Sequence, residues 1–190
     1  MKLENKKSVF IETPIPGLVI INKPIYVDER GSLQEFLKNS EFKREGHLFH
    51  GEHAAISCSL PGIIRGIHTE EWNKLIVPIT GKMFAAYADT RINSPTFGKV
   101  FTYEFDNTKP NTKRTALIIP SGVGNSICVV DDQPVYYVYL NSEEWESSKA
   151  KGIAWDDPDL NINWPVKDPI ISERDKNNPR LRDVFPEKFK

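Results

Sequence analysis

The apolar residues of this chain occur in short runs, and turn residues close each run. Examples are GLVIINKPIYV (17–27), HAAISCS (53–59), KLIVPI (74–79) and RTALII (114–119), with Gly, Pro, Asn or Asp near their ends. Runs of this length and spacing are typical of antiparallel strands in a sandwich or barrel. The pattern predicts an all-β fold, and the one clear helical pattern is SLQEFLKNSEFKR (32–44), with Ser32 as its N-cap.

Gly81 separates two apolar runs and tolerates the positive φ of a tight hairpin. We therefore expect KLIVPI (74–79) and MFAAYAD (83–89) to pair as neighbouring strands. Alternation along the second run predicts one face with Met83, Ala85, Tyr87 and Asp89 and another with Phe84, Ala86 and Ala88.

The length of 190 residues fits one domain over 1–190. We expect an N-terminal arm to about residue 16, and a tail of loops and short helices from about residue 141. A formal charge of −1 gives no electrostatic argument for binding nucleic acid or an anionic membrane. Because no run approaches a membrane span and no apolar leader is present, we expect a cytoplasmic protein. Cys58 and Cys128 match no metal spacing and are expected to be buried free thiols.

The segment GIIRGIHTEEWNKL (62–75) brings Arg65, His68 and Lys74 within ten positions. On a regular strand the side chains of Arg65 and His68 point to opposite faces, so they share a pocket only if a bulge lies between them. The other histidines, His47, His50 and His53, fall in a polar stretch that is typical of a solvated loop.

A series of segments, read in order, resembles the motifs of the dTDP-4-dehydrorhamnose 3,5-epimerase family, a branch of the cupin barrels. The segments are DERGSLQEF (28–36), IIRGIH (63–68), KLIVPITGKMF (74–84), DTRINSPTFGK (89–99), PSGVGNS (120–126), WDDPDLNINWP (155–165) and ISERD (171–175). The resemblance spans roughly residues 16–182. It implies a jelly-roll barrel that epimerises nucleotide-linked 4-keto-6-deoxy sugars without a metal or cofactor. It also implies a homodimer in which N-terminal strands of one subunit line the partner's pocket.

The resemblance assigns catalytic roles residue by residue. His68 is similar to the family's general base, Asp175 to the carboxylate that orients it, and Lys74 to the cation beside the 4-keto oxygen. These residue types suit the chemistry, because a proton next to a ketone leaves only if the developing enolate is stabilised. A neutral imidazole can then accept that proton.

The same resemblance supplies candidates for substrate binding. Arg30, Glu35 and Arg65 are similar to residues that line the pocket for the nucleotide diphosphate and sugar. His53 stands where family members carry a side-chain amide near the sugar nucleotide. The resemblance therefore does not identify the nucleotide or the sugar. The full set of candidates is Tyr26, Arg30, Glu35, His53, Arg65 and Tyr139.

Two positions depart from the family pattern. Asn125 in PSGVGNS replaces a second histidine, and an amide cannot transfer a proton, although Asn125 stays a catalytic candidate through a bound water. Ala85 replaces the aspartate partner of that histidine, and we interpret the two changes as a joint loss. The GN pair (124–125) is similar to that expected of epimerases of GDP-linked 4-keto sugars.

The third departure concerns the family's tyrosine acid. A straight alignment places this position on Val138. We expect Tyr137 and Tyr139 to point to the other side of the sheet, unless a one-residue bulge returns one of them.

These residues predict an epimerase that acts at C3 alone or at C3 first. The alternatives are a full 3,5-epimerase and an inactive cupin that only binds sugar nucleotides. A metal-dependent cupin is disfavoured, since HTE (68–70) provides one imidazole where a histidine pair is expected. By analogy alone, the product would enter polysaccharide or lipopolysaccharide synthesis.

Overall fold

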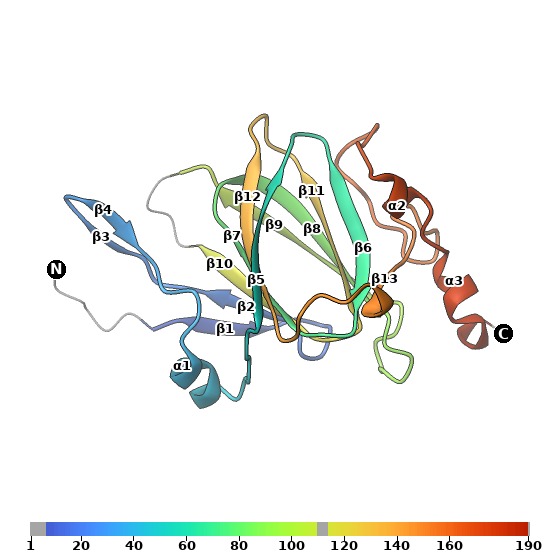
Figure 1. Cartoon of the computed structure of the whole chain (residues 1–190), viewed down its shortest axis with the longest axis horizontal. Helices are drawn as coiled ribbons and strands as arrows, with labels where there is room; N and C mark the ends of the chain where they lie inside the picture. The colour runs from blue at the N-terminus through green and yellow to red at the C-terminus, as the bar shows by residue number, and fades with distance from the viewer. Residues whose placement is uncertain (1–6, 110–113, 190) are drawn as a thin grey trace.

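The computed structural model describes residues 7–109 and 114–189, which form two antiparallel sheets (Figure 1). One sheet has the order β1 (Val9–Glu12), β2 (Val19–Asn22), β10 (Thr115–Ile119), β7 (Lys74–Pro78), β12 (Val135–Asn141) and β5 (His53–Ser59). The other has the order β13 (Ala150–Gly152), β6 (Ile64–Glu70), β11 (Val123–Val129), β8 (Gly81–Asp89) and β9 (Val100–Asn107). A separate hairpin joins β3 (Tyr26–Asp28) to β4 (Gly31–Leu33). The predicted all-β class is confirmed.

The main core lies between the two sheets. Ile76 and Leu117 from the sheet that contains β7 pack against Met83, Tyr87 and Ile127 from the sheet that contains β8. The alternation predicted for 83–89 is therefore correct. Phe84, on the opposite face of β8, packs against Trp164 instead, with ring centroids 5.7 Å apart.

Short helices and loops cover the outer faces of both sheets. Phe42 of α1 (Asn39–Arg44) packs on Val19, Leu75 and Val77, outside the six-stranded sheet. Ile153, Leu160 and Leu181 from the C-terminal segment pack on Ile67 and Ala88, outside the five-stranded sheet (Figure 1). The C-terminal segment also contains η1 (Ser147–Lys149), α2 (Glu173–Lys176), α3 (Leu181–Val184) and η2 (Pro186–Lys188).

The hairpin predicted at Gly81 is wrong. β7 pairs with β10 and β12, whereas β8 pairs with β11 and β9, so the chain crosses from one sheet to the other at this turn. Gly81 has φ +70°, and a Cβ there would lie 2.8 Å from Val135 Cγ2. The glycine is thus required for a sheet-to-sheet crossing, which gives the same local signal as a hairpin.

The helix predicted over 32–44 is shorter than expected. Gly31–Leu33 forms β4, Ser32 is no N-cap, and α1 begins at Asn39 after Lys38, which makes no side-chain capping bond. Phe36 and Leu37 still pack against the outer cluster. Phe36 and Leu37 thus pack from an extended segment, although their spacing is also that of a helix. The spacing of apolar residues alone cannot distinguish the two cases.

Further features concern the cysteines, the N-terminal arm and the helices. Cys58 and Cys128 are free thiols, but Cys58 is exposed because it lies on the edge strand β5. Residues 1–6 of the predicted N-terminal arm lie outside the described residues, and the rest of the arm contains β1, which pairs with β2. Within the described ranges, we find no helix long and apolar enough to cross a membrane.

Asp89 closes β8 in a fully buried position at the head of the DTRINSPTFGK segment. Its carboxylate accepts hydrogen bonds from Arg91 at 2.8 Å, Ser94 Oγ at 2.5 Å and Thr96 Oγ1 at 2.6 Å. Burial alone would raise the pKa of Asp89, but these hydrogen bonds outweigh burial and lower it from 3.8 to about 2. The ionised carboxylate therefore stabilises the folded state above pH 4.

We expect D89N to lower the free energy of unfolding by about 2 kcal/mol at pH 7, because the amide cannot replace a charged acceptor. The folded-state pKa lies below the unfolded value, so the wild type loses this contribution as the pH falls from about 4 to 2. Urea unfolding at pH 7 and pH 2.5 measures the effect. An equal difference between the two proteins at both pH values would contradict the prediction.

Candidate active site

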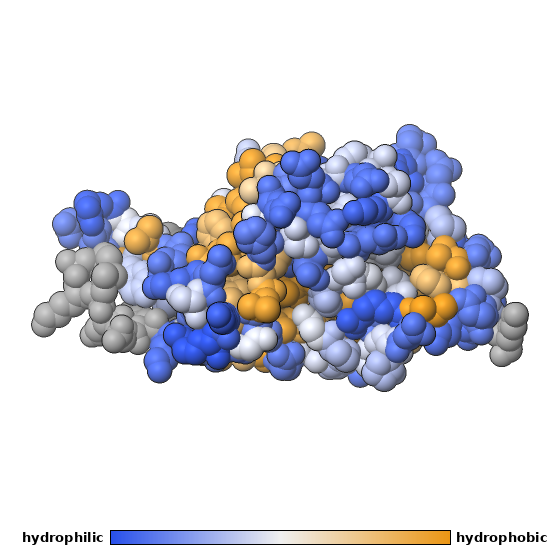
Figure 2. All heavy atoms as spheres, turned by 60° about the horizontal axis from the view of Figure 1, so that its bottom comes forward, coloured by the Kyte–Doolittle hydropathy of each residue, from blue (hydrophilic) through white to orange (hydrophobic). Residues whose placement is uncertain are grey.

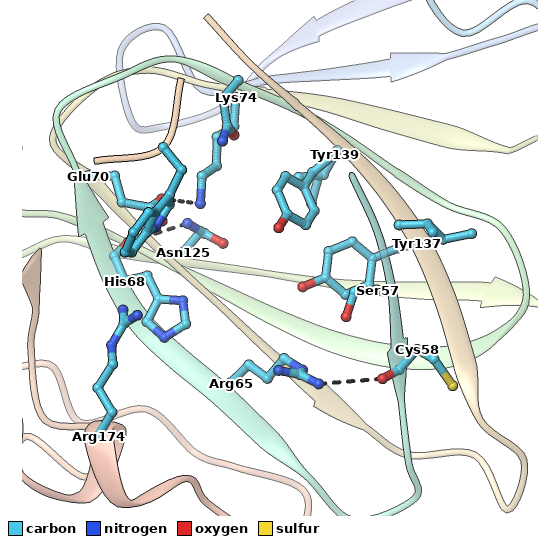
Figure 3. Close-up of a pocket in the computed structure, with 14 residues that line it drawn as sticks. Ser57, Cys58, Arg65, His68, Glu70, Lys74, Asn125, Tyr137, Tyr139 and Arg174 are labelled. Atoms are coloured by element: carbon cyan, nitrogen blue, oxygen red, sulfur yellow. Dashed lines mark hydrogen bonds and ion pairs between the residues drawn. The ribbon is translucent and has the colours of Figure 1, made fainter. Parts of the chain in front are cut away.

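A cavity of about 390 Å³ lies between the two sheets and gathers most of the predicted catalytic residues (Figure 3). β6 and β11 supply one side of its wall, β7 and β12 supply another, and α2 closes one end. The lining residues that matter for the chemistry are Arg65, His68, Glu70, Lys74, Asn125, Tyr137, Tyr139 and Arg174.

An irregularity in β6 brings Arg65 and His68 to the same cavity. His68 pairs with Asn125 and Arg65 with Ile127, so a step of three residues on β6 faces a step of two on β11. Gly66 lies within this bulge with φ +138°, and a Cβ there would lie 2.3 Å from Ser126 Cβ. The bulge that the sequence required for a shared pocket is thus present.

His68 is held by a buried carboxylate. His68 Nε2 lies 2.9 Å from Asp175 Oδ1, and Asp175 Oδ2 accepts a hydrogen bond from the Gly66 amide at 3.2 Å. Burial would raise the pKa of Asp175, but the hydrogen bonds from His68 and Gly66 outweigh it and lower the pKa. Because an ionised carboxylate only accepts, Nε2 carries the hydrogen that points to Asp175, and in the neutral ring Nδ1 has the free lone pair.

Lys74 projects into the cavity from β7 with its side chain 10% exposed. Its ammonium forms an ion pair with Glu70 and lies 5.8 Å from the centre of the Tyr139 ring. Burial lowers the pKa of Lys74, while the Glu70 carboxylate acts in the opposite direction. The cavity therefore holds a cation close to a candidate base.

Tyr137 and Tyr139 both line the cavity, so the prediction that they face away is wrong. On β12 they pair with Ser57 and Ala55, on the face that looks inward, whereas Val138 lies on the opposite face. Val138, the position that the straight alignment gave to the family's tyrosine, therefore does not enter the cavity. Burial raises the pKa of Tyr137, and a hydrogen bond with Ser57 acts against that rise.

Asn125 also faces the cavity, from the centre of β11. Its Nδ2 donates a hydrogen bond to the backbone oxygen of His68 at 3.3 Å. The amide thus ties β11 to the strand that carries His68, and Figure 3 shows its carbonyl oxygen turned toward the tyrosines.

Within one chain, three substrate-binding candidates lie away from this cavity. Tyr26 and Arg30 belong to the β3–β4 hairpin, and Glu35 follows it. All three border other hollows of the surface. Arg30 is 78% exposed and pairs with Asp28 at 2.6 Å. The structure therefore unites Arg65 and Tyr139 with His68, but not Tyr26, Arg30 or Glu35.

The remaining histidines do not share one environment. His50 is exposed in a loop, His47 stacks on Phe10 with ring centroids 5.2 Å apart, and His53 begins β5. His53 borders a hollow next to the cavity, 6.5 Å from the Tyr139 ring, and its Nδ1 is buried without a partner. No group of three or more His, Cys, Asp or Glu residues in 7–109 and 114–189 could hold a metal ion.

Several lining residues were not identified from the sequence. Glu70 follows His68 by two positions and so shares its face of β6. The alternation of side chains along a strand could have predicted this placement. Arg174 precedes Asp175 in the ISERD segment, with Nε 3.8 Å from Asp175 Oδ1. Ser57, Asn141 and Trp145 carry no distinctive local pattern, because only the pairing of distant strands brings them to the cavity.

Comparison with known proteins gives consistent results. The profile of the dTDP-4-dehydrorhamnose 3,5-epimerase family matches residues 12–183. A dTDP-4-dehydrorhamnose 3,5-epimerase of Shigella flexneri is 32% identical over 182 residues, which cover 92% of this chain and 96% of the relative. A dTDP-4-dehydro-6-deoxyglucose 3-epimerase of a Streptomyces species is also 32% identical, over 163 residues that cover 83% of this chain and 81% of the relative.

A solved structure agrees with these sequence matches. The 3,5-epimerase RmlC of Legionella pneumophila, in complex with dTDP-4-keto-L-rhamnose, superposes with a TM-score of 0.85 at 25% identity. The match covers 95% of this chain and 96% of that one.

We expect G66A to lower the free energy of unfolding by more than about 2 kcal/mol, because the new Cβ collides with Ser126 at a strained φ. G46A is the matched control, since Gly46 has φ +82° and open space around its Cβ. The control should lose about 1 kcal/mol from the backbone conformation alone. Urea unfolding of both variants tests the difference, and equal losses would show that the bulge is not tightly packed.

Proposed function

The chain belongs to the dTDP-4-dehydrorhamnose 3,5-epimerase family, and we propose that it inverts C3 of a nucleotide-linked 4-keto-6-deoxy sugar. The sugar-nucleotide epimerase class follows from the family. The observation that supports the finer proposal is one cavity lined by a carboxylate-held imidazole, an ammonium and two phenols (Figure 3).

The proposed first step uses His68 and Lys74. The free Nδ1 of His68 removes the hydrogen from C3 as a proton, and the electron pair of the C–H bond forms the C3–C4 double bond of an enolate. The negative charge moves to the 4-keto oxygen, where the Lys74 ammonium stabilises it in a site shielded from water. Asp175 holds the imidazole in the orientation that this transfer requires.

The second step returns a proton from the opposite side of the sugar ring. His68 extends from the five-stranded sheet, whereas Tyr137 and Tyr139 extend from the six-stranded sheet across the cavity. A flat enolate between the sheets would meet the base on one face and a phenol on the other. Tyr137 gives its proton to C3, and both residues then exchange protons with water to restore the starting state.

Action at both C3 and C5 is a second candidate, and a specific observation favours it. The sequence argument for C3 alone relied on the absence of a tyrosine acid, yet two tyrosines line the cavity. The relatives named as 3,5-epimerase and as 3-epimerase are each 32% identical to this chain, over 182 and 163 residues. The position of isotope uptake separates the two candidates.

We expect the wild type to introduce deuterium at C3 of dTDP- or GDP-linked 4-keto-6-deoxy sugars in deuterated water, as read by NMR and mass spectrometry. H68N should lower this exchange at least about 100-fold, because the amide cannot accept the proton. Circular dichroism controls for folding. No exchange at any carbon with any of these sugars would contradict the proposal.

The two tyrosines form a matched pair for the same assay. Y137F should retain wash-in of deuterium at C3 but lose inversion, since the base still works while the opposite acid is missing. Y139F should keep inversion. The reverse result would assign the acid to Tyr139, and uptake at C5 by the wild type would establish the second candidate.

We also propose that the active form is a homodimer in which the β3–β4 hairpin brings Tyr26, Arg30 and Glu35 to the partner's cavity. In Figure 1 this hairpin stands away from the barrel. Apolar side chains on both edge strands of the six-stranded sheet are exposed, with Val9 at 54% and Ile56 at 66%. Figure 2 shows hydrophobic residues gathered in a band near the middle of the face that it displays.

A mixed dimer tests this arrangement. R30A and H68N homodimers should both be nearly inactive, whereas a tagged heterodimer of the two should recover about half of the wild-type activity. One of its two cavities combines an intact His68 with an intact Arg30 from the other chain. An inactive heterodimer, or an active monomer in size-exclusion chromatography, would contradict the proposal.

A further inference from the structure

The Glu70–Lys74 ion pair is the unexplained feature of the cavity. Both side chains are nearly buried, at 8% and 10% exposed, and both line the cavity (Figure 3). A carboxylate beside the group that should stabilise an enolate weakens the positive field there, so its presence requires a reason. A purely structural ion pair in this place would oppose the chemistry.

The pair also joins the two sheets. Glu70 ends β6 on the same face as His68, whereas Lys74 begins β7 in the opposite sheet, next to Asn141 of β12. The chain turns between the sheets over residues 71–73. The ion pair therefore holds the Lys74 ammonium, which extends from the six-stranded sheet, beside the end of the strand that carries His68.

Apart from Glu70 and the Tyr139 ring, whose centre lies 5.8 Å from the ammonium, the described groups around Lys74 do not favour a charged amine. Besides Glu70, the titratable or charged side chains that line the cavity with Lys74 are Cys58, Arg65, His68, Tyr137, Tyr139 and Arg174. Arg174 acts against the positive charge of Lys74, and Asp175 is engaged with His68 and Gly66. Among the described residues that line the cavity, Glu70 is the only carboxylate.

We propose that Glu70 is a positioning residue that keeps Lys74 protonated and aimed at the substrate ketone. An ammonium buried without a counter-ion is costly and tends to lose its proton, and a neutral amine would stabilise an enolate far less. Glu70 removes that cost before the substrate arrives. The inference rests on the proposed function of Lys74, but its central statement concerns the unliganded protein.

The first test needs no substrate. In protein labelled with [ε-¹³C]lysine, the Lys74 signal is assigned by its absence from K74M and followed by NMR over pH. We expect its midpoint in E70Q to fall by about 1 to 3 pH units relative to the wild type. E71Q is the matched control, because Glu71 is adjacent but exposed and pairs with Lys151 at 2.6 Å. The control should leave the Lys74 midpoint in place.

The second test is the pH profile of deuterium exchange at C3. In E70Q the alkaline limb of kcat/KM, which reports the free enzyme, should move to lower pH by the same amount as the midpoint, with KM at the acidic end within about twofold of the wild type. Exchange near the acidic end of the profile should approach the wild-type rate. A purely structural role would lower kcat equally at all pH values.

An unchanged Lys74 midpoint in E70Q overturns the inference, whatever the activity. A raised KM with an unmoved alkaline limb also overturns it, since Glu70 would then contact the substrate directly. If the midpoint falls but the wild type exchanges no sugar hydrogen, the pairing is correct and the proposed function fails. The two failures are therefore distinguishable.

Discussion

The hydrogen bond between His68 and Asp175 is the interaction on which the arrangement of the site depends. It joins residues 107 positions apart, one on β6 and one on the short helix α2. The apolar contacts of Ile153, Leu160 and Leu181 hold the C-terminal segment against the five-stranded sheet and so bring Asp175 to the barrel. The same carboxylate accepts the Gly66 amide, so the bulge of β6 and the orientation of the imidazole are set together.

The two-layer fold explains why these groups can act on opposite faces of one substrate. The five-stranded sheet provides His68, and the six-stranded sheet provides Lys74 and the two tyrosines. A cavity between two layers places each group at a fixed height along its strand, and alternation decides which side chains enter it. Loop changes at the surface can then alter the substrate without disturbing the reacting groups.

Much of this arrangement could be predicted from the sequence. The short apolar runs indicated antiparallel strands. The motif series proposed His68, Lys74 and Asp175 as candidates, and the structure places His68 and Lys74 in one cavity with Asp175 bonded to His68. The crossing at Gly81 was not predictable, because the conformation of one turn does not reveal which strand pairs with which. The prediction that Tyr137 and Tyr139 point away from the pocket was wrong for a related reason. A shift of one residue along β12 exchanges the two faces of the strand.

The most direct test of the central claim is the tautomer of His68. In ¹⁵N-histidine-labelled protein, at a pH where the ring is neutral, long-range ¹H–¹⁵N spectra should show the hydrogen on Nε2 and a free lone pair on Nδ1. In D175N this preference should be reduced or lost, because the ionised acceptor is gone. A ring that carries its hydrogen on Nδ1, or one whose spectrum is unaffected by D175N, would contradict the account.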